Sequence, residues 1–127
     1  MILAYEKRDG IIFGVFPETV REKDILLLAD EIENVEKDYV VLTNRIVSLC
    51  NVKLFDVNFS AILRLSERRN KKVFSNCFKT ALLVSNKYQL GFARMYQTFI
   101  ENPQMSIEIF MDESKALEWL RSPDTRG

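Results

Sequence analysis

The pattern of hydrophobic and polar residues at the start of the chain is typical of a β-hairpin. Two β-prone runs, 2–8 and 11–16, flank the pair Asp9-Gly10. Asp-Gly favours a type I′ turn, because that turn needs positive φ at both central residues. Pro17 ends the second run. We therefore expect the fold to begin with two antiparallel strands.

From Glu22 to Val35 the apolar residues recur with the spacing of one helical face. This stripe predicts an amphipathic helix, and Leu26 and Leu27 are expected to widen its buried side. The members of the stripe are Ile25, Leu28, Ala29, Ile32 and Val35.

The run 39–43 is short, continuous and β-branched, which predicts a buried strand of a covered parallel sheet. Residues 46–57 fit neither the helical nor the strand period, so the segment 44–57 stays unassigned. Asn58 is a suitable N-cap for a following helix, which finishes in the charged run 67–72. Positive charge there suits the C-terminal end of the helix dipole.

The rest of the chain alternates between segments predicted as strands and segments predicted as helices. Residues 78–85 and 106–111 are predicted strands. Asn86 caps a predicted helix over 87–101, which ends before Pro103. Asp112 caps a last helix over 113–120.

These elements predict an α/β fold: a mixed, mostly parallel sheet of about five strands with an N-terminal β-hairpin and about four helices. We expect a single domain over residues 1–121 and a flexible C-terminal tail over 122–127, which is polar and contains proline.

The composition of the chain excludes several classes of catalytic and metal site and argues against one class of partner. The 127 residues hold 18 Lys+Arg, 18 Asp+Glu and no histidine. Zero net charge argues against a nucleic-acid partner. Without histidine, Ser-His and Cys-His nucleophile systems and all His-containing metal sites are excluded. Cys50 and Cys77 match no redox or zinc spacing, and we expect both to be small buried residues. We predict no catalytic residues, no metal and no cofactor.

No apolar run reaches the roughly 18 residues of a membrane span, and charged residues follow the N-terminus closely. We therefore expect a cytoplasmic protein.

The helix over 87–101 holds more large apolar residues than one sheet-facing side can hide. Phe92, Tyr96 and Phe99 are the surplus, accompanied by Met95. Two explanations stay open: the segment 46–57 covers them, or they line a homodimer contact or a small apolar pocket. Arg94 lies between them and is a candidate to orient a ligand carboxylate.

Two further clusters have a functional and a structural interpretation. The start of the same helix, with Asn86, Lys87 and Tyr88, lies where open α/β sheets bind anions, although no phosphate loop is present. The basic run of Arg68, Arg69, Lys71 and Lys72 is interpreted as a solvated helix end rather than a binding patch.

Two strings of the second half carry a family resemblance, together with the Asp-Gly hairpin. Residues 91–99 read GFARMYQTF, and residues 109–120 read IFMDESKALEWL. The chain resembles the small bacterial STAS-like proteins, which share the fold of the anti-sigma-factor antagonist SpoIIAA.

That resemblance implies a switch serine at the start of the second helix, within an Asp-Ser-Ser-Gly pattern. The sequence departs from the pattern there and reads FDVNFSA over 55–61, leaving Asp56 and Ser60 as the possible switch region. The structural alternative is ordinary helix-start chemistry.

Two function classes follow. The first is a non-enzymatic, STAS-like regulatory or protein-interaction module, with an unknown protein partner or a second copy of itself. The alternative is a binding protein or sensor for a small apolar ligand held beside the helix over 87–101.

Overall fold

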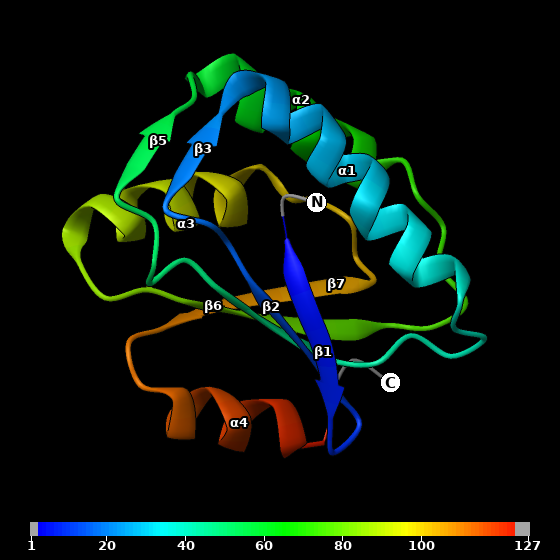
Figure 1. The fold of residues 1–127 in the computed structure, drawn as a ribbon. Helices are drawn as coiled ribbons and strands as arrows, with labels where there is room; N and C mark the ends of the chain where they lie inside the picture. Colours follow the sequence, from blue (N-terminus) through cyan, green and yellow to red (C-terminus); the bar gives the residue numbers. More distant parts are fainter. Residues whose placement is uncertain (1–2, 124–127) are drawn as a thin grey trace.

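The computed structural model describes residues 3–123. Within this range the strands and helices follow one another as shown in Figure 1. They are β1 (Ala4–Arg8), β2 (Ile11–Val15), β3 (Thr19–Arg21), α1 (Glu22–Lys37), β4 (Arg45–Ser48), β5 (Leu54–Asp56), α2 (Phe59–Asn70), β6 (Phe78–Leu83), α3 (Lys87–Phe99), β7 (Met105–Phe110) and α4 (Glu113–Arg121).

The main sheet has five strands in the order β1-β2-β4-β6-β7. Strand β1 is antiparallel to β2, and every other pair is parallel. The hairpin turn is as predicted, because Asp9 and Gly10 both have positive φ, 51° and 79°. The fold class predicted from the sequence is thus confirmed, with its mixed five-stranded sheet and four helices.

Helices α1, α2 and α3 cover one face of the sheet, and α4 covers the other (Figure 1). The two faces hold separate cores. The larger core includes Leu28, Ile62 and Leu82, while the smaller one, against α4, includes Ile46, Ala81 and Ala116. Alternate residues of β6 therefore enter opposite cores, as the period of a strand requires.

The third strand of the sheet is not where the sequence predicted it. Residues 39–43 form a loop in which Val40 is 89% exposed, and the strand β4 begins at Arg45 instead. Leu42 is the one fully buried residue of the run. Its N–H donates to Asn76 Oδ1 at 2.8 Å, and its carbonyl accepts from Asn76 Nδ2 at 2.9 Å. These two hydrogen bonds to a side chain replace the backbone hydrogen bonds to neighbouring strands that the apolar run was expected to form.

The unassigned segment contains both β4 and a short strand, β5. Strand β5 pairs in parallel with β3 as a separate two-stranded sheet. This small sheet lies beside the N-terminal ends of α1 and α2 in Figure 1. Strands β3 and β5 have three residues each and β4 has four, which is too short for a readable period, and this is why none of the three was predicted.

Three burial predictions are wrong. Leu26 and Leu27 of α1 are 62% and 53% exposed, so they do not widen the buried face. Cys77 is exposed, and Cys50 is only half-buried. Arg69 is 2% exposed and lies inside the protein rather than at a solvated helix end.

The helix ends agree closely with the predicted caps. The side chains of Asn58, Asn86 and Asp112 each accept a hydrogen bond from a backbone N–H of the first helical turn. At the other end of α4, Ser122 is held by Lys79, whose Nζ donates to its carbonyl at 2.8 Å. Residues 124–127 of the predicted tail lie outside the described residues.

Candidate functional site

A cavity of about 120 Å³ lies between the sheet and the three helices α1, α2 and α3. Neighbouring strands supply its floor in rows across the sheet, because Ile12, Arg45 and Thr80 are paired in register. The next row on the same face is formed by Gly14, Val47 and Leu82, two residues further along each strand. All six residues line the cavity.

The walls of the cavity are almost entirely apolar. The helices contribute residues such as Leu28, Leu65 and Ala93, and β5 contributes Phe55. The polar side chains among the lining residues are Tyr5, Arg45, Arg69, Thr80 and Tyr96.

At the edge strand β1 the cavity approaches the surface, because Tyr5 lines it and is 45% exposed. The site therefore combines an apolar interior with a rim open to solvent.

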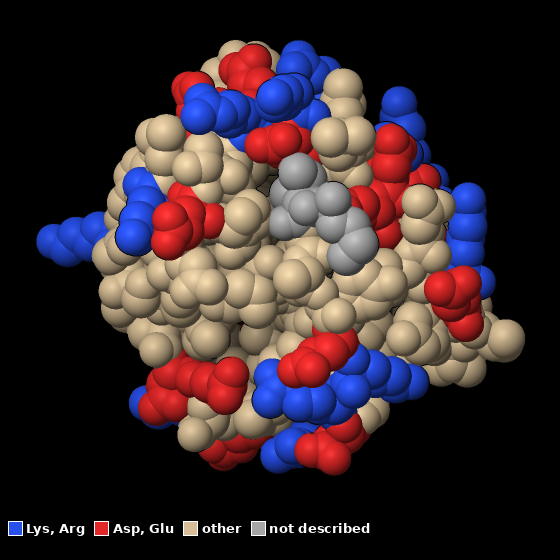
Figure 2. Space-filling model, viewed as in Figure 1, with Lys and Arg blue, Asp and Glu red and all other residues tan. Residues whose placement is uncertain are grey.

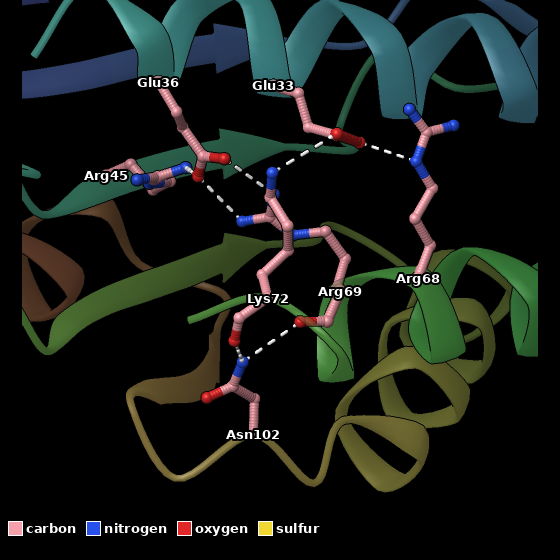
Figure 3. A network of polar contacts seen from close by, with 7 residues as sticks. All are labelled: Glu33, Glu36, Arg45, Arg68, Arg69, Lys72 and Asn102. Carbon is pink, nitrogen blue, oxygen red and sulfur yellow. Dashed lines mark hydrogen bonds and ion pairs between the residues drawn. The ribbon is translucent and has the colours of Figure 1, made fainter. Parts of the chain in front are cut away.

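A buried ion cluster borders this cavity (Figure 3). Glu36, in the last turn of α1, accepts a hydrogen bond from Arg45 Nη1 at 2.8 Å. Arg69, on α2, binds the same carboxylate with two parallel hydrogen bonds of 2.7 Å, from Nη1 and Nη2. The three side chains are 8%, 10% and 2% exposed for Glu36, Arg45 and Arg69. One carboxylate thus pairs with two guanidinium groups inside the protein.

The end of α2 is held in place by asparagines, which fixes where Arg69 enters the interior. Asn102 Nδ2 donates to the carbonyls of Arg69 and Lys72, at 3.0 and 2.8 Å. Asn70 Nδ2 donates to the carbonyl of Phe99 at 2.9 Å. These bonds supply donors to the carbonyls of Lys72, after α2, and of Phe99, at the end of α3. They add a second donor to the carbonyl of Arg69, which also accepts from the Lys72 N–H at 3.2 Å.

The pKa values in the cluster follow from burial and pairing. Burial raises the pKa of Glu36, but hydrogen bonds and charge from Arg69 and Arg45 outweigh it and leave the pKa below 4.5. Burial lowers the pKa of Arg45 against the opposing effect of Glu36. Burial also raises the pKa of Tyr96, so its hydroxyl stays neutral at physiological pH.

Three nitrogens of the cluster have no hydrogen-bond acceptor among the described residues. They are Nε and Nη2 of Arg45 and Nε of Arg69. Both guanidinium groups also lie over aromatic rings, Arg45 at 4.2 Å from the centre of Phe78 and Arg69 at 5.2 Å from that of Phe74. An aromatic face stabilises a cation but satisfies no N–H donor at the edge of the guanidinium plane.

The sequence-predicted residues of α3 are divided between the cavity and the surface. Phe92 and Tyr96 line the cavity. Phe92 also stacks on Phe55, with ring centres 4.3 Å apart, so the segment 46–57 covers part of the aromatic surplus. Phe99 does not line the cavity and packs edge-on against Phe59 of α2 at 5.2 Å. Arg94 is exposed and away from the cavity lining.

The possible switch region lies at the small sheet. Asp56 ends β5 and is exposed, 3.5 Å from Arg21 across the β3–β5 pair. Ser60 is exposed in the first turn of α2, next to the Asn58 cap. The structure does not join these two residues to the cavity lining.

Sequence reasoning missed the three residues of the ion cluster. Arg45 lies in the unassigned segment, Glu36 was not singled out, and Arg69 was placed with its basic neighbours on the surface. Arg68, next to it, does lie outside, 2.8 Å from Asp30. A usable signal existed in the helical spacing: Arg69 is four residues beyond the buried Leu65 and so falls on its face.

The outer surface carries charges of both signs. In Figure 2 they gather over α1 and α2 and again near α4 and the hairpin turn, with an uncharged band between. Within residues 3–123 no group of three or more acidic or cysteine side chains is able to hold a metal ion. No helix in that range has the length and hydropathy needed to cross a membrane.

Comparison with known proteins defines the fold and not the activity. No family model matches the chain, and no curated protein matches it. A solved structure does: an uncharacterised protein of the DUF3478 family from Shewanella loihica PV-4, described as having a SpoIIAA-like fold. The TM-score is 0.60 over 93% of this chain and 91% of that one, at 14% identity. The fold is SpoIIAA-like. At this identity the SpoIIAA-like fold carries no residue roles with it, so function has to be argued from the site.

Proposed function

We propose that this SpoIIAA-like domain is a non-enzymatic binding protein that takes a small, largely apolar ligand into the cavity beside α3. The observation that carries the proposal is the cavity itself, about 120 Å³ in the larger core. At roughly 24 cal/mol per Å³, leaving such a volume unfilled costs on the order of 3 kcal/mol. That is a sizeable share of the 5–15 kcal/mol by which domains are stable, and a ligand would offset it.

The size of the cavity indicates the size of its ligand. A dry, engineered cavity of about 150 Å³ binds benzene, so about 120 Å³ suits a single ring or a short chain. Phe92 and Tyr96 of α3 supply aromatic wall, and the exposed Tyr5 marks the side from which a ligand enters.

A pair of matched variants tests the proposal. Ala93 and Ala116 are both buried helical alanines, 1% and 0% exposed, but only Ala93 lines the cavity. We expect benzene to raise the melting temperature of the wild type and of Ala116→Leu, and to leave that of Ala93→Leu unchanged, because leucine fills the space. At 100 times the dissociation constant the stabilisation is about 2.7 kcal/mol. Equal responses from the two variants, or none from the wild type, would refute the proposal.

A protein-interaction role is the second candidate, in the form of self-association. It is supported by large apolar side chains exposed around β5, where Leu54 is 45%, Tyr88 is 44% and Phe59 is 57% exposed. Phe59 contacts Phe99, which extends the surface to α3. Sedimentation of the wild type and of Phe59→Asp tests this: a dimer that the substitution dissociates supports it, and a monomeric wild type refutes it.

A further inference from the structure

The hydroxyl of Thr80 gives the cavity a chemical preference that its apolar walls do not. Thr80 lies on β6, in the row of the cavity floor that also contains Ile12 and Arg45. It is 6% exposed, and within residues 3–123 its hydroxyl has no hydrogen-bond partner. A buried hydroxyl normally finds a partner, because its desolvation is otherwise uncompensated. A ligand that supplies this partner is therefore favoured over one that does not.

The accessible surface of Thr80 locates its hydroxyl. Among the described residues, the hydroxyl of Thr43 also lacks a partner and is fully enclosed, whereas that of Thr80 keeps accessible surface. Side chains of a strand alternate between the two faces of a sheet. Ala81 lies in the core against α4, whereas Thr80 and Leu82 line the cavity on the face covered by α1, α2 and α3 (Figure 1). The hydroxyl therefore opens into the cavity rather than toward bulk solvent.

The other polar groups of the cavity lining are already engaged or lie at its rim. The guanidinium groups of Arg45 and Arg69 bind Glu36, and their nitrogens without an acceptor are fully enclosed. The hydroxyl of Tyr96 interacts with Arg69, and Tyr5 lies at the exposed edge. In the part of the chain that the structure describes, the interior of the cavity thus offers a ligand a free hydroxyl and no free charged donor.

The geometry points to a small neutral alcohol or phenol as the ligand, with its hydroxyl bound to Oγ1 of Thr80 and its apolar part against the walls. A ligand hydroxyl pairs with Thr80 whichever way the Thr80 O–H points, because both groups can donate and accept. A charged ligand would be buried without a counter-charge, and a hydrocarbon would leave the Thr80 hydroxyl without a partner. This inference rests on the proposed function and names the chemical class of its ligand.

Phenol and benzene are the probes, because they differ by one hydroxyl, and calorimetric titration measures their affinities. Thr80→Val keeps the branched shape and suits a strand but removes the hydroxyl. We expect it to weaken phenol binding at least about tenfold, because the buried phenol hydroxyl loses its partner, and to change benzene binding by no more than about twofold. Thr43→Val is the matched control. It removes a buried hydroxyl outside the cavity lining and should change neither affinity by more than about twofold.

The outcomes separate the two proposals. Benzene binding to the wild type, with phenol affinity reduced equally by the two valine variants or by neither, would overturn the hydroxyl inference and leave the apolar site standing. Failure of the wild type to bind either probe would overturn both.

A second measurement on the wild type covers the case in which Thr80→Val does not fold. In the complex with phenol, the two ring protons next to the hydroxyl should give stronger nuclear Overhauser contacts to the Thr80 methyl group than the ring proton opposite the hydroxyl. The reverse order would place the phenol hydroxyl away from Thr80 and overturn the inference.

Discussion

The buried ion cluster predicts a severe effect of one nearly isosteric substitution, Glu36→Gln. The Glu36 side chain is 8% exposed and accepts three hydrogen bonds of 2.7–2.8 Å from Arg45 and Arg69. Glutamine has the same size but carries no charge, and its amide group directs N–H donors at guanidinium donors. Two buried cations would then face each other without a counter-charge. Removing one partner of a buried ion pair typically costs 3–5 kcal/mol, and we expect a loss of about this size.

Urea unfolding measures this loss directly. With a slope of about 2 kcal/mol per molar urea, the midpoint of Glu36→Gln should lie roughly 2 M below that of the wild type. Glu33→Gln is the matched control, one helical turn earlier on α1. Glu33 pairs with Arg68 and Lys72, which are 38% and 40% exposed, so its loss should cost no more than about 1 kcal/mol. Equal costs for the two substitutions would show that the cluster is not the desolvated charge network described above.

Other predictions concern single contacts. The pKa of Glu36 is lower in the folded protein than its ordinary 4.5, so the stabilisation from the Glu36 carboxylate should be complete above pH 4.5 and be lost as the pH falls through the folded pKa. The urea midpoint of the wild type should therefore decline between pH 7 and pH 3, and the midpoint of Glu36→Gln should decline less. Asn102→Ala should cost about 1–3 kcal/mol in urea unfolding, because the carbonyl of Lys72 loses its donor and the carbonyl of Arg69 keeps only backbone N–H donors. Asp112→Ala should cost about 1 kcal/mol as the lost N-cap of α4. Cys77 is exposed and Cys50 half-buried, so a thiol reagent should modify Cys77 first in the native protein, and the reverse order would contradict the packing.

Local sequence signals determined most of the secondary structure. The Asp9-Gly10 turn needs only its own two residues, since both positive φ angles follow from their chemistry. The Asn58, Asn86 and Asp112 caps bond to backbone groups two or three residues away. Strand β6 was readable from the apolar run at its end, and strand β7 from the alternation of apolar and polar residues along MSIEIF. With the strand–helix alternation, these signals were enough to predict the sheet class.

Tertiary structure alone decided the third strand and the site. The apolar run 39–43 forms a loop, and residues 45–48 form the strand instead, with Arg45 paired in register between Ile12 and Thr80. Helical spacing places Arg69 on the face of the buried Leu65, but no local rule predicts the burial of Arg45, because a buried arginine is tolerable only when a carboxylate is buried beside it. That carboxylate, Glu36, is 9 residues from Arg45 and 33 from Arg69 in sequence. The cavity depends likewise on how three helices and a sheet fit together. Sequence period therefore determined which residues form elements, and the packing of those elements determined which charges are buried and which space is left open.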